Sequence, residues 1–118
     1  MTNIMTTPEP DLAEPMLAAL SDGTRRSIVH ALRGGARSVG DLAEDMPVSR
    51  PAVSQHLRVL TDCGLLTVTR RGTQRLYCIA PLAVQELRRY LDGLWDDALS
   101  AYAAEARRQA NSKKGGQS

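Results

Sequence analysis

The sequence predicts a mostly α-helical fold that also contains one small β-hairpin. A chain of 118 residues fits one compact domain. Only 3% of the residues are aromatic and none is Phe, so Leu, Val, Ile, Ala and Met must build the core. Such a core suits packing between helices. Two strand-like runs occur, at residues 65–69 and 75–79, and the expected order is therefore α-α-α-α-β-β-α.

Two helices are expected before residue 35. In residues 11–20 the apolar side chains recur at helical spacing, and we expect Pro15 to restrict the regular helix to the residues that follow it. Asp22 is a suitable N-cap for a second helix that continues to about Arg33. The glycines at 34–35 then end this helix.

A pair of short helices with a tight connection follows. Ser38, with an acidic residue three positions later, predicts the start of a third helix, which ends before Pro47. Ser49 predicts the cap of a fourth helix that has Pro51 in its first turn and that ends at about residue 62. The lengths of these two helices and their short connection are typical of a helix-turn-helix.

The remainder of the chain predicts a hairpin and one long helix. Residues 70–74 form the basic tip of the hairpin, whose glycine suits a turn, and the hairpin would be the wing of a winged helix-turn-helix. The long helix extends from residue 82 to about 108. We expect residues 1–10 and 109–118 to be flexible, which leaves 11–108 as the domain.

These motifs resemble a known family of regulators. The DNA-binding core of ArsR/SmtB-family winged-helix repressors is similar to SVGDLAEDMPVSRPAVSQHLRVLTDCGLLTVTRRGTQRLYCI, and the preceding helix of the family is similar to LSDGTRRSIVHAL. The resemblance covers about residues 12–102 and is most specific in VSRPAVSQHLRVL. It implies a homodimeric repressor that binds double-stranded DNA at an inverted-repeat operator. The alternative is a protein-interaction module with weak or no DNA binding.

The fourth helix supplies the first group of candidate DNA contacts. At about 100° per residue its apolar residues face the core and its polar residues face away from it. The N-terminal part of such a helix reads base edges in the major groove, and Arg58 is placed for a phosphate. His56 lies at the margin of the two faces, where a phosphate contact and simple packing are equally open. The candidates are Ser49, Arg50, Pro51, Ser54, Gln55, His56 and Arg58.

The hairpin supplies the second group. Net charge is only +2, but residues 46–80 hold five arginines against a single acidic residue. A basic hairpin beside a recognition helix can reach the flanking minor groove or the DNA backbone. The alternative for the hairpin is a loop that only makes the protein more soluble. The alternative for the fourth helix is an ordinary solvated polar face. The candidates are Arg70, Arg71, Thr73 and Arg75.

The last helix carries more apolar surface than one small domain is expected to cover, which implies a partner. The family resemblance suggests that this helix and the first one form a two-fold dimer. The alternative is that the apolar stripe packs wholly within one chain. The candidate interface residues are Leu12, Met16, Leu17, Leu87, Leu91, Leu94, Trp95, Ala98 and Tyr102.

Other classes of function are not expected. Metal-binding family members often carry cysteines in the third helix, which has none here, and the last helix has no histidine, so we predict no metal and no cofactor. No catalytic motif is recognisable, so we predict no enzyme. No apolar run spans a bilayer and residues 1–15 lack a secretory signal, so we expect no membrane association and a cytoplasmic protein. Cys63 and Cys78 are interpreted as reduced thiols, and the sequence identifies no effector.

Overall fold

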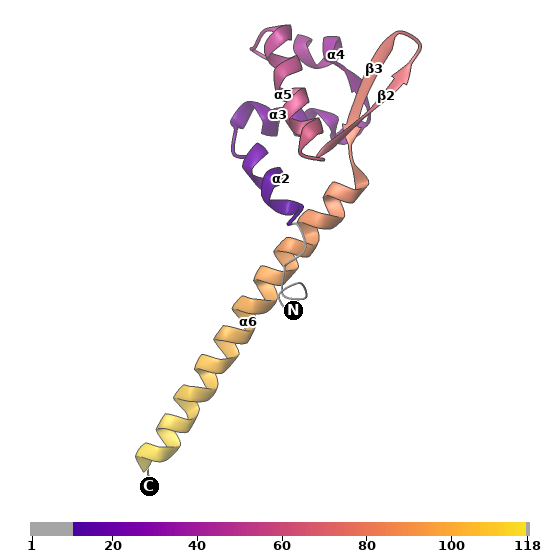
Figure 1. Ribbon diagram of the computed structural model, residues 1–118. Coiled ribbons are helices and arrows are strands. Elements are labelled where there is room, and N and C mark those ends of the chain that lie inside the picture. The colour runs from indigo at the N-terminus through magenta and orange to yellow at the C-terminus, as the bar shows by residue number, and fades with distance from the viewer. Residues whose placement is uncertain (1–10, 118) are drawn as a thin grey trace, which may run out of the picture. The chain divides into compact units, whose positions relative to one another are not determined.

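The structure, a computed structural model, describes residues 11–117 and the side chains up to residue 112. It is mostly helical and contains one small antiparallel sheet, as the sequence predicts (Figure 1). Residues 1–10, which the sequence predicts to be flexible, lie outside the described part. The elements are α2 (Ala13–Ala19), α3 (Gly23–Ala31), the 3-10 helix η1 (Leu32–Gly34), β1 (Arg37–Ser38), α4 (Val39–Glu44), α5 (Arg50–Asp62), β2 (Leu66–Arg71), β3 (Gln74–Ile79) and α6 (Pro81–Gln117).

Contacts divide the chain into two units that meet between Leu87 and Arg88. The first unit contains every element from α2 to β3 and the beginning of α6. The second unit is the remainder of α6. Among residues 11–117 no helix combines the length and the apolar character that crossing a membrane requires.

Local signals define both ends of α5. The Ser49 hydroxyl accepts a hydrogen bond from the backbone N–H of Ala52 at 3.3 Å, which caps the first turn. At the other end, the N–H of Leu65 donates to the carbonyl of Leu60 at 3.0 Å, and Gly64 lies between them with φ of +92°. This is a Schellman cap, in which glycine takes the left-handed conformation at little cost. The predicted start and end of this helix are confirmed.

The core of the first unit forms around the apolar side of α5. Val53, Leu57 and Leu60 are fully buried, as the helical spacing predicts. Ile28 from α3 and Leu42 from α4 are fully buried in the same cluster. This burial holds α4 and α5 together as a helix-turn-helix beside the β2–β3 hairpin (Figure 1).

The sheet contains a strand that the sequence did not predict. Its order is β1-β3-β2, and β1 pairs with β3 through Arg37 opposite Tyr77 and Ser38 opposite Leu76. A strand of two residues has no periodicity of its own, and it exists here because β3, far along the chain, offers hydrogen-bonding partners.

The hairpin is longer and its turn tighter than predicted. The strands continue to Arg71 and from Gln74, so the turn consists of Gly72 and Thr73 alone, with Gly72 at φ of +64°. The prediction of a loop over residues 70–74 is therefore wrong. The wing arginines belong to paired strands, which fixes the direction in which each side chain leaves the sheet.

Two helix boundaries near prolines also differ from prediction. Helix α2 begins at Ala13, before Pro15, because a proline in the first turn removes no intrahelical hydrogen bond. The Asp11 carboxylate accepts a hydrogen bond from the N–H of Ala13 at 3.1 Å and supports this earlier start. Helix α4 ends at Glu44, two residues before the predicted limit at Met46.

Helix α6 continues past the predicted end at Arg108 and reaches Gln117. The Glu105 side chain accepts a hydrogen bond from Gln109 at 3.3 Å and also pairs with Arg108. Such pairs three and four residues apart stabilise an exposed helix. The alanines at 103, 104, 106 and 110 favour the same conformation.

We predict that Gly64→Ala destabilises the first unit by about 1–2 kcal/mol, because alanine disfavours the positive φ at this cap. The added Cβ would also meet the Cε of Met16 at 3.4 Å. Urea denaturation measures the change. Gly34→Ala is the matched control, since no atom would lie within 4 Å of its Cβ and its φ is not positive. Equal stability of the two variants would contradict the role of the Gly64 cap.

Candidate nucleic-acid interface

The face of α5 that points away from the core is polar and exposed. Pro51, Ser54, Gln55 and Arg58 are all exposed, whereas the residues on the other side of the same helix are fully buried. The first two turns of α5 are therefore free to contact another molecule. Ser49 is exposed too, although its hydroxyl oxygen already serves as the helix cap.

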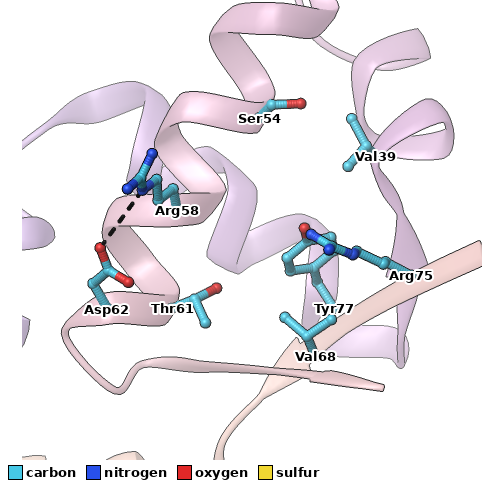
Figure 2. A pocket seen from close by; sticks show the side chains of 8 residues that line it. All are labelled: Val39, Ser54, Arg58, Thr61, Asp62, Val68, Arg75 and Tyr77. Atoms are coloured by element: carbon cyan, nitrogen blue, oxygen red, sulfur yellow. Dashed lines mark ion pairs between the residues drawn. The ribbon is translucent and has the colours of Figure 1, made fainter. Parts of the chain in front are cut away.

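A groove lies between α5 and the sheet (Figure 2). Its α5 side carries polar groups, among them Ser54 and Arg58, and Arg75 extends into it from β3. The Arg58 Nε lies 4.0 Å from an oxygen of Asp62, and both side chains are about three-quarters exposed at 77% and 75%. Such a pair is weak in water, so Arg58 remains available to an anion. The groove residues are Val39, Ser54, Arg58, Thr61, Asp62, Val68, Arg75 and Tyr77.

The three wing arginines do not form one surface. In the register of the hairpin Arg70 lies opposite Arg75, and Arg71 lies opposite Gln74. Directly opposite residues share a face and consecutive residues alternate, so Arg70 and Arg75 are on one face and Arg71 is on the other. The face of Arg75 is also the face of Val68 and Tyr77, which line the groove beside α5.

Arg50 lies against α4. The Arg50 guanidinium lies beside Gly40, where an added Cβ would be in ordinary van der Waals contact with it at 3.8 Å. A second groove joins Arg50 to the wing, where Thr73 and Arg75 line it. Asp41 and Glu44 line the same groove, so its cations are partly balanced by carboxylates. Arg50 thus reaches the space between α4 and the wing tip, beside the face of α5.

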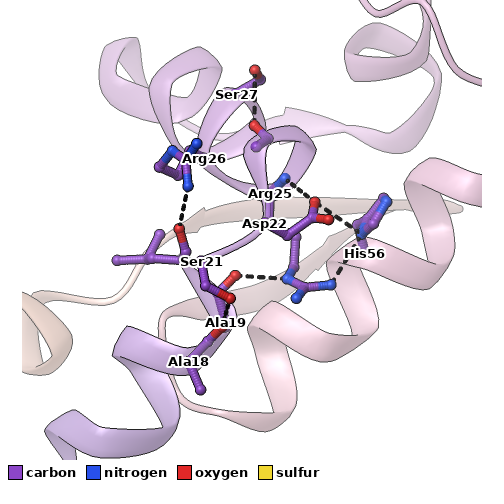
Figure 3. Close-up of polar contacts among 10 residues, drawn as sticks. Ala18, Ala19, Ser21, Asp22, Arg25, Arg26, Ser27 and His56 are labelled. Carbon is purple, nitrogen blue, oxygen red and sulfur yellow. Dashed lines mark hydrogen bonds and ion pairs between the residues drawn. The ribbon is translucent and has the colours of Figure 1, made fainter.

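His56 faces α3 and not the exposed side of α5 (Figure 3). Its Nδ1 lies 3.4 Å from a terminal nitrogen of Arg25 and 4.0 Å from an oxygen of Asp22. The side chain is 23% exposed. Of the two interpretations that the sequence left open for His56, this geometry favours packing within the chain over a phosphate contact.

Asp22 caps α3 next to this histidine. Its carboxylate accepts a hydrogen bond from the backbone N–H of Arg25 at 3.0 Å. That hydrogen bond lowers the pKa of Asp22 below its ordinary value of 3.8, and the nearby positive charge of Arg25 acts in the same direction. Asp22 is therefore ionised throughout the neutral range.

Comparisons with known proteins agree with this arrangement. Residues 22–68 match the family described as bacterial regulatory protein, arsR family. The HTH-type transcriptional regulator Rv2034 of Mycobacterium tuberculosis (strain ATCC 25618 / H37Rv) is 52% identical over 85 residues, which are 72% of this chain and 79% of that protein. The chain belongs to the ArsR family. Its similarity extends over both the helix-turn-helix and the elements around it.

Two further comparisons, one with a sequence relative and one with a solved structure, agree with this result. The transcriptional repressor SdpR of Bacillus subtilis (strain 168) is 35% identical over 68 residues, 58% of this chain and 76% of that protein. The solution structure of the homodimeric winged helix-turn-helix DNA-binding domain Mb0332 from Mycobacterium bovis has a TM-score of 0.60 and 29% identity. The match covers 74% of this chain and 81% of that one. The predicted winged helix-turn-helix of this ArsR-family chain is confirmed.

The candidate dimer residues fall into two groups. Met16 is only 4% exposed and belongs to the core of the first unit, and Leu17 and Leu87 are half-buried. Met16 is thus occupied within its own chain and is not available to a partner. The other candidates are exposed in the single chain, with Trp95 at 64% and Tyr102 at 75%. This exposed group consists of Leu12, Leu91, Leu94, Trp95, Ala98 and Tyr102.

Within the described residues, no group of three or more His, Cys, Asp or Glu side chains is arranged to hold a metal ion. Cys63 and Cys78 are free thiols and both are half-buried. The Cys78 sulfur lies 3.2 Å from the Thr67 hydroxyl, on the neighbouring strand.

Sequence reasoning missed several residues of the site. Val39, Thr61 and Tyr77 line the groove, but their positions depend on how three elements meet in space. Arg25 was also missed, because its contacts are with residues on other elements. Only Thr61 had a detectable signal, since it lies two turns after Ser54 on the same helix.

We predict that stability depends on pH through Asp22. Its folded pKa is lowered, so its stabilising effect is fully present above the ordinary value of 3.8 and is lost as the pH falls through the folded pKa. Asp22→Asn keeps a good N-cap but cannot titrate. Urea midpoints should therefore fall more steeply below about pH 4 in the unchanged protein than in the variant. Parallel curves for the two proteins would contradict this.

Proposed function

We propose that this ArsR-family transcriptional regulator binds an inverted-repeat operator in double-stranded DNA as a homodimer and represses transcription by occluding the promoter. The observation that carries the proposal is the division of α5 into two sides. Its apolar side is fully buried, and Ser54 and Gln55 on its first two turns are exposed. A helix held in this way can enter the major groove with its N-terminal part foremost.

The residues on α5 suit distinct roles in such a complex. Gln55 can donate to and accept from the edge of an adenine, and Ser54 can bond either kind of base. Pro51 adds apolar contact at the start of the helix. Arg58 lies further along the helix, where a phosphate is the natural partner. Arg50, which lies against α4, is placed for a base or for the adjacent backbone.

The wing adds a charge argument for an anionic partner. Arg70 and Arg75 lie directly opposite each other on one face of the hairpin. Like charges in this position destabilise a strand pair by roughly 0.2–1 kcal/mol. A DNA phosphate between or beside them would remove that repulsion. A solubilising role would not require two arginines on the same face at paired positions.

The homodimer follows from the apolar surface of α6. Four large side chains at helical spacing are about half or more exposed in the single chain: Leu91, Leu94, Trp95 and Tyr102. Exposed apolar surface of this kind favours association, and a two-fold dimer would present two copies of α5 to successive turns of DNA. A DNA target supports a location in the cytoplasm. Its mode of action is binding and not catalysis.

The deciding experiment is selection of genomic fragments by the purified protein, followed by a gel shift of the enriched duplex against random competitor DNA. The proposal expects one inverted-repeat sequence to be enriched and to resist the competitor. If no duplex is preferred while the protein is folded and dimeric, the protein is instead an interaction module.

We predict that Gln55→Ala and Arg75→Ala affect binding in different ways. Gln55→Ala should relax the base preference by roughly 1–3 kcal/mol, whereas Arg75→Ala should weaken binding to all sequences alike and reduce the salt slope by about one. Fluorescence anisotropy with operator and random duplexes at several salt concentrations measures both effects. Gln85→Ala, an exposed glutamine on α6, is the matched control. Identical effects of the two variants on both duplexes would contradict these roles.

We also predict that Trp95→Glu disrupts the dimer, because it places a charge within the exposed apolar group of α6. Light scattering should then report a monomer. Operator affinity should fall by about tenfold or more, since the two half-sites no longer bind together. Ser100→Glu introduces the same charge on the opposite side of the helix and should leave both measurements unchanged. A dimer that persists in Trp95→Glu would contradict the interface.

A further inference from the structure

Arg25 joins three helices through separate atoms (Figure 3). Its Nε donates a hydrogen bond to the carbonyl of Ala19, at the end of α2, at 2.7 Å. Its backbone N–H donates to Asp22, the cap of α3, at 3.0 Å. Its terminal nitrogen Nη1 lies 3.4 Å from Nδ1 of His56 on α5. One side chain thus connects the end of α2 to the recognition helix.

The chemistry of this contact limits the roles of the ring nitrogens of His56. A guanidinium has only donors, so Nδ1 acts as the acceptor in a hydrogen bond with Arg25, and the tautomer that permits this bond carries its proton on Nε2. The Asp22 carboxylate, 4.0 Å from the same nitrogen, is the other charged group that faces this ring. His56 is therefore held at one edge by α3, while its neighbour Gln55 is exposed.

The adjacent arginine provides a comparison within the same chain. Arg26 also donates to a carbonyl at the end of α2, that of Leu20 at 2.8 Å. Within the described residues, no hydrogen bond or ion pair joins the Arg26 side chain to α5. The two arginines therefore share a charge, a helix and a type of capping contact, and differ in the connection to His56.

We propose that Arg25 is a positioning residue for DNA recognition, which sets the rotation of α5 through His56 and so directs Gln55 and Ser54 toward the bases. The inference rests on the proposed function. Buried apolar residues hold α5 in place but allow small rotations about its axis, because apolar contact is non-directional. A hydrogen bond at the edge of the helix has a preferred direction and limits that rotation.

The test compares Arg25→Gln with Arg26→Gln, which remove the same charge. Arg25→Gln should lower affinity for the selected operator by about tenfold and affinity for random duplex by less than about twofold. Arg26→Gln should change both affinities by less than about twofold. The salt slope should be the same in both variants, because neither arginine is assigned a phosphate. A slope reduced only in Arg25→Gln would indicate direct DNA contact and overturn the proposal.

Substitutions at His56 test whether the effect of Arg25 on operator affinity depends on the imidazole ring. His56→Leu removes the acceptor and should reproduce the loss, and adding Arg25→Gln to it should cause no further loss. His56→Asn places a carbonyl oxygen at about the position of Nδ1 and should retain most of the operator affinity. Additive losses in the double variant, or no rescue by His56→Asn, would overturn the proposal.

Two further measurements separate this inference from folding and from the proposed function. Arg25→Lys can still donate to Ala19 but cannot also reach His56, so it should be folded by circular dichroism and show the same loss of operator preference. If the unchanged protein prefers no duplex, the proposed function fails, and imidazole spectra then test the contact between Arg25 and His56 by itself. Imidazole ¹⁵N spectra should show the Nε2–H tautomer of His56 in the unchanged protein and in Arg26→Gln. In Arg25→Gln the spectra should show a mixture of the two tautomers. A tautomer that is the same in Arg25→Gln as in the unchanged protein would contradict the hydrogen bond between Arg25 and His56 and overturn the proposal.

Discussion

The burial of one side of α5 is the constraint on which the remaining features depend. Val53, Leu57 and Leu60 are fully covered by α3, α4 and the sheet, and their transfer from water is the main free-energy gain that holds the helix in place. Because these residues occupy one stripe, the opposite stripe must face outward. The exposure of Ser54 and Gln55 is therefore a consequence of core packing.

In the wing, electrostatic repulsion between two arginines opposes the strand pairing that is observed. Arg70 and Arg75 repel each other across the strands, yet the hairpin holds them in register because the strand pairs nearer the core bury Leu66 and Tyr77. The buried end of the hairpin thus stabilises an exposed end that is unfavourable by itself. An arrangement of this kind is expected where a charged partner supplies the missing interaction.

The sequence predicted those parts of the site whose signals are local. Ser49, Pro51 and Gly64 define α5 by their own preferences, and the spacing of its apolar residues defines its buried side. The strand β1 and the extension of the hairpin strands to Arg71 and Gln74 were not predicted, because they depend on pairing between segments far apart or on register. The same limit applies to Met16, which has the spacing of an interface residue but fills the core beside Gly64.

Helix α5 is held by two kinds of interaction that act on different degrees of freedom. Apolar burial restrains its distance from the core and tolerates rotation within the width of the stripe. The Arg25 guanidinium acts at one edge of the helix, where even a small rotation changes the distance to His56 appreciably. Base recognition requires donors and acceptors to be placed within a few tenths of an ångström, on the scale of hydrogen-bond geometry. A helix that only had to remain folded would need the first interaction alone, and one that reads bases benefits from the second.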